Sequence, residues 1–87
     1  MISFNYVITD EVGIHARPAG ALVKAAKAYG SKIVLENLSN GKSADAKKLM
    51  LLMSLGVKKG DEVKVTVEGD DEAVAAEELE KFFGENL

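Results

Sequence analysis

Apolar and polar residues alternate in three stretches of the chain, and this pattern predicts strands with one buried face. The inward positions are Ile2, Phe4, Tyr6 and Ile8 in the first stretch, Ile33 and Leu35 in the second (32–36), and Val63, Val65 and Val67 in the third (61–68). A polar turn is predicted over 10–13. A short fourth strand is predicted over 42–44, after a turn over 37–41 whose Asn40-Gly41 pair is the strongest short hairpin signal.

Three other stretches carry apolar residues at helical spacing and predict helices over 16–29, over 46–55 and after Gly69-Asp70-Asp71. The apolar stripes are Ala19, Leu22, Val23 and Ala26 in the first helix, and Ala75, Ala76, Leu79, Phe82 and Phe83 in the last. Gly30 and Gly56 are expected to stop the first two helices, and either aspartate to cap the third. The order βαββαβα with half-buried strands predicts an α+β fold, in which one sheet keeps a polar face in water and carries helices on the other.

The middle predicted helix is apolar on every side. Leu52 and Leu55 are expected to face the sheet, which leaves Leu49, Met50 and Met53 together on another, exposed face. An exposed apolar patch usually marks a partner surface, and methionine suits a surface that accepts several partners. An oligomer interface and a deeper burial are the alternatives.

Composition limits the class of protein. The chain has 87 residues, which predicts one domain over 1–87, and it has no cysteine and one histidine. Disulfides and zinc sites are therefore excluded, and we expect no metal and no cofactor. We find neither a signal-peptide pattern nor an apolar run of about 20 residues, so we expect a cytoplasmic protein without membrane insertion. The net charge of −3 argues against nucleic acid as a partner.

The charge is unevenly distributed. Residues 1–67 hold ten Lys and Arg against six Asp and Glu, a net of +4, whereas residues 68–87 hold one Lys against eight acids, a net of −7. The acids are explained either as the solvated face of the last helix or as the counterpart of a basic face that docks acidic proteins.

The stretch 13–20 contains the only histidine and the only proline of the chain. His15 stands at the start of the predicted first helix, and Pro18 suits the first turn, where its missing N–H is not needed. Free N–H groups and the positive end of the helix dipole favour an anion there, and phosphate is the usual one. A neutral surface or cap histidine is the alternative.

The run Gly-Ile-His-Ala-Arg-Pro-Ala over 13–19 resembles the active-site signature of the HPr family, the histidine-containing phosphocarriers of the bacterial phosphoenolpyruvate-dependent sugar phosphotransferase system. Residues 40–43, Leu49, Met50 and 53–56 resemble the family's second signature, and 60–72 are similar as well. The resemblance covers essentially the whole chain. It implies the same βαββαβα order, known there as an open-faced β-sandwich: a four-stranded antiparallel sheet with three helices on one face.

The resemblance implies a phosphoryl carrier rather than an autonomous enzyme. Phosphorylated enzyme I would pass its phosphoryl group to Nδ1 of His15, which would pass it to a sugar-specific enzyme IIA. Residue chemistry agrees, because neutral imidazole is a nucleophile near pH 7 and a guanidinium such as that of Arg17 pairs with phosphoryl oxygens. Amides of Ala16 or Arg17 would add donors. A monomer is expected.

The family's partner face carries over by position to Ala16, Arg17, Gly20, Lys24, Lys27, Leu49, Met50 and Met53. Two departures from the family stand out. Lys48 occupies the place of a serine that a regulatory kinase phosphorylates in many members, so that switch looks absent, and Ser43 or Asp45 is left to cap an earlier helix start. The hairpin over 37–41 is about two residues longer than expected. An HPr-like paralogue in a nitrogen-related or regulatory phosphorelay, or a regulatory binding module, is the alternative function.

Overall fold

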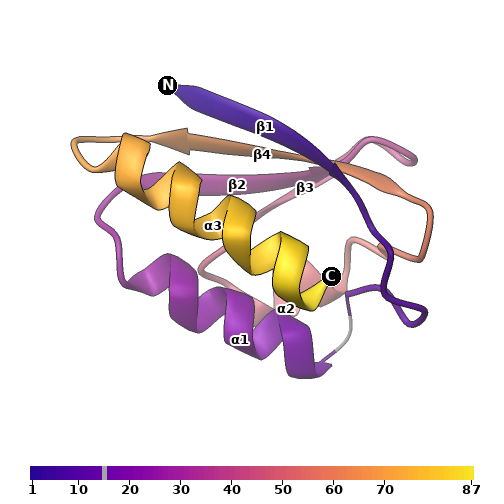
Figure 1. Cartoon of the computed structure of the whole chain (residues 1–87). Coiled ribbons are helices and arrows are strands. Elements are labelled where there is room, and N and C mark those ends of the chain that lie inside the picture. Colours follow the sequence, from indigo (N-terminus) through magenta and orange to yellow (C-terminus); the bar gives the residue numbers. More distant parts are fainter. Residues whose placement is uncertain (15) are drawn as a thin grey trace.

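The computed structural model describes residues 1–14 and 16–87 and has two layers, a four-stranded antiparallel sheet with helices on one face (Figure 1). In chain order the elements are β1 (Ile2–Val7), α1 (Ala16–Lys27), β2 (Lys32–Asn37), β3 (Lys42–Asp45), α2 (Leu49–Met53), β4 (Glu62–Glu68) and α3 (Glu72–Asn86). The strand order in the sheet is β1-β4-β2-β3. The predicted fold, an open-faced sandwich, is confirmed.

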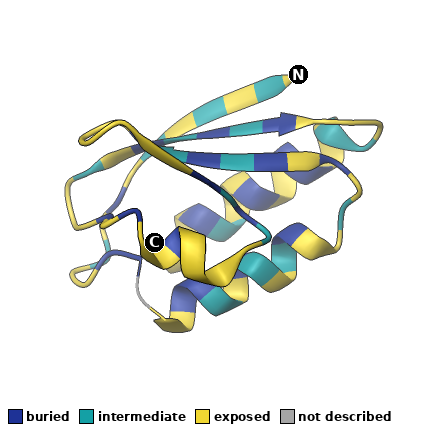
Figure 2. Ribbon diagram, turned by 180° about the vertical axis from the view of Figure 1, so that it is seen from behind, coloured by how far each residue is buried: buried dark blue, intermediate teal, exposed yellow. Residues whose placement is uncertain are grey.

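The two central strands, β4 and β2, supply the most deeply buried part of the sheet. Their inward residues stand opposite one another in rows, with Leu35 paired to Val65 and Ile33 to Val67. Phe4 of β1 extends the first row from the other side of Val65. The alternating burial in Figure 2 follows from this register, because each strand turns every second side chain towards the helices. All three predicted patterns of alternation are confirmed.

Two long helices cover the inner face of the sheet. The predicted stripes of α1 and α3 are buried, apart from Val23 and Phe82, which are half-buried. The ring of Phe83 meets the edges of Phe4 and Tyr6 at centroid distances of 5.9 and 5.6 Å. This aromatic cluster fixes α3 against the edge strand β1.

The middle helix is shorter than the sequence predicts. Its apolar run predicted a helix over 46–55, but α2 has five residues. The amide of Ala46 donates to the carbonyl of Ile33 at 2.9 Å, and Asp45 accepts the next two amides, one on its carboxylate and one on its carbonyl. The backbone of Lys48 is extended, at φ −120° and ψ 105°, so the helix begins only after it.

The predicted hairpin is confirmed, and its loop spans 38–41, because Asn37 pairs with Lys42. Gly41 has a φ of 76°, and its amide donates to the carbonyl of Asn37 at 2.8 Å. Asn40 does not adopt a positive φ, so Asn40-Gly41 is not the two-residue type I′ turn that this pair often forms. The side chain of Asn40 donates to the carbonyl of Leu55 and accepts the amide of Lys42.

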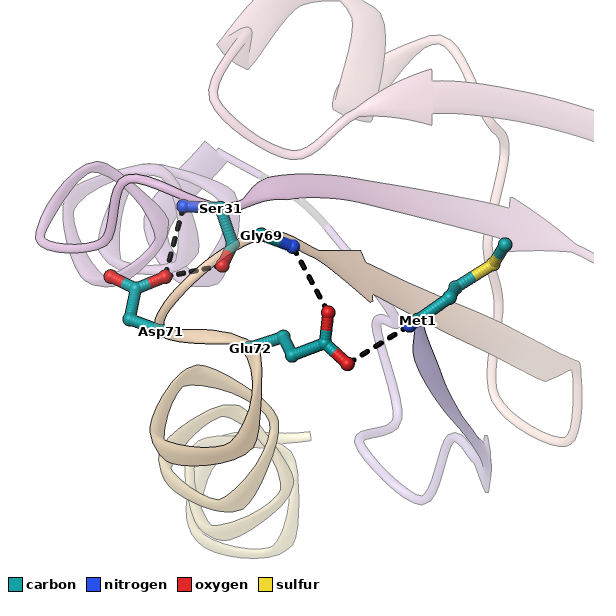
Figure 3. Close-up of polar contacts among 5 residues, drawn as sticks. All are labelled: Met1, Ser31, Gly69, Asp71 and Glu72. Carbon is teal, nitrogen blue, oxygen red and sulfur yellow. Dashed lines mark hydrogen bonds and ion pairs between the residues drawn. The ribbon is translucent and has the colours of Figure 1, made fainter.

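The start of α3 corrects another expectation. Asp71 occupies the N-cap position, but its carboxylate makes no cap hydrogen bond. It accepts instead the amide of Gly30 at 2.9 Å. It also accepts the amide of Ser31 at 3.0 Å and the hydroxyl of Ser31 (Figure 3). Glu72 accepts the amide of Gly69 at 3.1 Å and lies 2.9 Å from the amino group of Met1. The aspartate therefore ties the start of α3 to the turn between α1 and β2.

The end of α1 also differs from the prediction of a stop at Gly30. The helix ends at Lys27, and the two following amides bond three residues back in a tighter turn. The ammonium group of Lys47 donates to the carbonyl of Tyr29 at 2.8 Å. A cation from the segment before α2 thus supports the C-terminal end of α1, where the helix dipole is negative.

The Asp71 contacts predict how stability depends on pH. The hydrogen bond from the Ser31 hydroxyl, followed by those from backbone amides, lowers the pKa of Asp71 below its ordinary value. A carboxylate with a lowered folded-state pKa stabilises the fold above its unfolded-state pKa, about 3.9, and loses this contribution as the pH falls through the folded-state value. We expect Asp71→Asn to lower the melting temperature at pH 7 and to reduce its fall between pH 4 and pH 2. Asp70→Asn, the exposed neighbour, is the control, and equal pH profiles for the two variants would contradict this account.

Candidate functional site

The first helix begins at Ala16, directly after His15 in the sequence. His15 lies outside the described residues, so its predicted role is not tested by the geometry. The first turn of α1 contains no acidic residue, and Pro18 within it is buried. The N-terminal amides and the positive end of the dipole meet no acidic residue of the helix itself there, which favours an anion.

Arg17 is exposed in this same turn. It lines a hollow of about 100 Å³ together with Asp10, Pro18, Ala21 and Asn86. Within residues 1–14 and 16–87 its guanidinium makes no ion pair. A cation in the first turn of a helix lies near the positive end of the helix dipole, which is unfavourable. A bound anion would compensate both the cation and the dipole. The Arg17 guanidinium is therefore available to pair with phosphoryl oxygens, which is the role predicted for it.

The loop before His15 is held by backbone contacts. Gly13 has a φ of 79°, and a Cβ there would collide with the carbonyl oxygen of Val57 and approach Lys58 Cα to 2.8 Å. Next to it, the buried Ile14 donates its amide to the same Val57 carbonyl at 3.2 Å. The carboxylate of Asp10 accepts the amide of Val12, and its carbonyl accepts that of Gly13, so the predicted polar turn over 10–13 is confirmed. The chain thus reaches His15 from a fixed point on the segment after α2.

The predicted partner residues of α1 form one stripe. At 100° per residue they fall within an arc of about 100°, opposite the buried side of the helix. They are Ala16, Arg17, Gly20, Lys24 and Lys27; the glycine is half-buried and the other four are exposed. This stripe, the basic stripe below, brings three cations onto one outward face.

The predicted apolar patch on α2 is exposed, as expected. The exposed fractions are 39% for Leu49, 77% for Met50 and 41% for Met53, whereas Leu52 is fully buried. Leu55, the expected core partner of Leu52, is also buried. Because Leu49, Met50 and Met53 are exposed, the alternative of a deeper burial of the patch is excluded. Leu51, at 46%, was not assigned to the patch from the sequence, although the run was recognised as apolar on every side.

These four side chains, Leu49, Met50, Leu51 and Met53, are the α2 patch below. Helices α1 and α2 pack against each other (Figure 1), so the basic stripe and the α2 patch lie on neighbouring elements. Figure 2 shows α2 with most of its surface exposed. The two groups that the sequence analysis joined into one partner face are thus brought together by the fold.

The residue that precedes α2 occupies the position at which the family resemblance implies a regulatory serine. Lys48 is the N-cap, with extended backbone at φ −120° and ψ 105°, and makes no side-chain cap hydrogen bond. Neither of the alternatives proposed for an earlier cap is used: Ser43 lies in β3, and Asp45 closes the turn before the helix. The helix therefore begins without a capping hydroxyl or carboxylate.

Two further properties concern only the part of the chain that the structure describes. No group of three or more His, Cys, Asp or Glu there could hold a metal ion. No helix there is both long and apolar enough to cross a membrane.

Comparison with known proteins identifies the class. A family model described as the PTS HPr component phosphorylation site matches residues 2–85. The histidine-containing phosphocarrier protein of Mycoplasma is 32% identical with a TM-score of 0.87, over 93% of this chain and 90% of that one. An HPr from Thermoanaerobacter tengcongensis is 41% identical with a TM-score of 0.85, over the full length of both.

The fold, the family match and these structures define a phosphocarrier of the phosphotransferase system. This chain belongs to the HPr family. Crh, the catabolite-repression protein of Bacillus subtilis, is also similar, at 36% identity and a TM-score of 0.76 over 100% of this chain and 98% of that one. That protein is described as a swapped, intertwined dimer, so both monomers and dimers must be considered for this fold.

Proposed function

We propose that this phosphocarrier accepts a phosphoryl group from phosphorylated enzyme I on His15 and passes it to enzyme IIA components. The single observation that carries the proposal is the start of α1 at Ala16, directly after the only histidine, with a first turn free of acidic residues. Arg17 in that turn adds a cation that no described carboxylate pairs.

The chemistry requires little more than these groups. The lone pair of a neutral imidazole nitrogen attacks phosphorus, a P–N bond forms, and the bond between phosphorus and the donor atom breaks with its electrons going to the donor. The amides of Ala16 and Arg17 and the Arg17 guanidinium would bind the phosphoryl oxygens throughout. The labile P–N bond then lets the group move to the acceptor.

Partner binding is proposed for the basic stripe and the α2 patch together. The positive charge of residues 1–67 speeds encounter with acidic partners at low salt, and the apolar side chains supply the contact that holds them. We propose a cytoplasmic monomer formed by residues 1–87 as one domain, which acts with its partners rather than as an autonomous enzyme. Lys48, which has no hydroxyl, would leave it outside serine-kinase control at α2.

A regulatory binding module is the second candidate, because the chain is 36% identical to Crh. A protein that only binds would not need a histidine at the start of α1. The presence of His15 and Arg17 therefore favours the relay.

The relay predicts that His15 is the only phosphoryl acceptor. The wild-type chain, incubated with enzyme I, Mg²⁺ and phosphoenolpyruvate, should gain one acid-labile phosphoryl group by intact-mass measurement. His15→Ala should gain none while keeping the wild-type circular dichroism spectrum and melting temperature. An acid-labile adduct that persists in this variant would show that another residue accepts the group.

Docking on the α2 patch predicts a separation of binding from stability. Met50→Glu places a charge in an apolar contact, so kcat/KM for phosphorylation by enzyme I should fall by about tenfold or more, the cost expected for a central interface residue. The melting temperature should change little, because Met50 is exposed. Val74→Glu, the same type of change at an exposed position of α3, should alter neither quantity. Wild-type kinetics for Met50→Glu would remove the α2 patch from the interface.

A further inference from the structure

The segment that leaves α2, residues 55–58, contacts both the hairpin and the loop that leads to His15; we name it the exit segment. On the hairpin side, the carbonyl of Leu55 accepts two side-chain amides. Asn37 Nδ2 donates to it at 3.2 Å and Asn40 Nδ2 at 2.9 Å. This carbonyl follows the last turn of a helix, where backbone acceptors need partners from outside the helix.

At Val57 and Lys58, the exit segment contacts the loop that leads to His15. The carbonyl of Val57 accepts the amide of Ile14 at 3.2 Å, and Gly13 approaches Val57 and Lys58 too closely for any side chain. Ile14 is the residue directly before His15 in the sequence. A displacement of Val57 must therefore be transmitted to the phosphoacceptor loop.

A carboxylate completes the hairpin-side contact. Asp61 accepts the amide of Lys58 at 3.0 Å and lies 3.4 Å from Asn37 Nδ2. The two asparagines of the hairpin thus support both ends of the exit segment. Asn37 and Asn40 both bind the carbonyl of Leu55, and Asn37 reaches Lys58 through Asp61.

We infer that Asn40, supported by Asn37, is a positioning residue for phosphoryl transfer, because it fixes the exit segment that joins the α2 patch to the phosphoacceptor loop. This inference rests on the proposed function of His15. A helix of five residues has no stability of its own, so its orientation depends on what holds its ends. The same hydrogen bonds set both the docking helix and the residue before His15.

Asn40 is the member of this pair that can be tested without loss of the fold. It is exposed, its Oδ1 accepts the amide of Lys42 at 2.9 Å, and, among the described residues, its Nδ2 binds only the exit segment. Asn37 also accepts a hairpin amide, that of Ser39, but it is buried, so its replacement would disturb the packing beneath the hairpin.

The experiment compares Asn40→Ala and Asn40→Asp with the same two substitutions at Asn5. Asn5 is a matched control, because its exposed Nδ2 donates at 3.0 Å to Glu62 on the outer side of the sheet, away from the helical layer. Two quantities are measured at 25 °C in each folded variant: hydrogen exchange of the Ile14 amide, and kcat and KM for phosphorylation by enzyme I.

Loss of one hydrogen bond to the exit segment should raise the exchange rate of the Ile14 amide about three- to tenfold in Asn40→Ala. The value of kcat/KM should fall by a similar factor. Part of this fall should come from a lower kcat, which a defect in docking alone would not cause. Asn40→Asp should have the larger effect, because its carboxylate faces the carbonyl of Leu55. Both Asn5 variants should stay within about twofold of the wild type.

Three results would overturn the inference. Asn40 variants with wild-type exchange at Ile14 would show that the exit segment is not held by this side chain. Faster exchange with unchanged kcat/KM would make the contact structural only. A wild-type chain that enzyme I does not phosphorylate would contradict the proposed function itself, and the inference with it, before any variant is compared.

Discussion

The rest of the structure depends on a sheet that is covered on one face only. The inward rows of β4 and β2 need a helical layer, and the two long helices supply it with stripes that include Leu22, Leu79 and Phe83. The short α2 lies beside them and buries one of its own residues, Leu52. Its other side chains remain in water, where exposed apolar area is unfavourable and a partner protein can cover it.

This arrangement links the proposed docking surface to the proposed phosphoacceptor loop through a short stretch of backbone. The carbonyls of Leu55 and Val57 lie two residues apart, and one is held by the hairpin while the other holds Ile14. The docking helix and the loop that leads to His15 are consequently supported by the same segment. In the proposed relay, recognition and transfer would therefore share a support outside the residues proposed to touch the partner or the phosphoryl group.

The sequence predicted the features that arise from periodicity and local chemistry: the strands, the long helices, the α1 boundary at Ala16 and most of the α2 patch. The prediction from sequence failed where a residue far away in the chain binds a group that was expected to make a local contact. The carboxylate of Asp71 was expected to cap α3, but amides of the α1–β2 turn bind it, and Ala46 was expected in a helix, but β2 holds its amide. The bonds from Asn37 and Asn40 to Leu55 cross 18 and 15 residues, a separation at which periodicity carries no information.

The central claim, that partners bind the helical side of the molecule through α2, is tested most directly by NMR mapping of the interface. Enzyme I is added to the isotope-labelled chain, and changes are followed at the methyl groups of Leu49, Met50 and Met53. These signals should shift and lose solvent accessibility, whereas those of Val34 and Thr66 on the open face of the sheet should not change. Shifts on the open face with an unperturbed α2 would contradict the account.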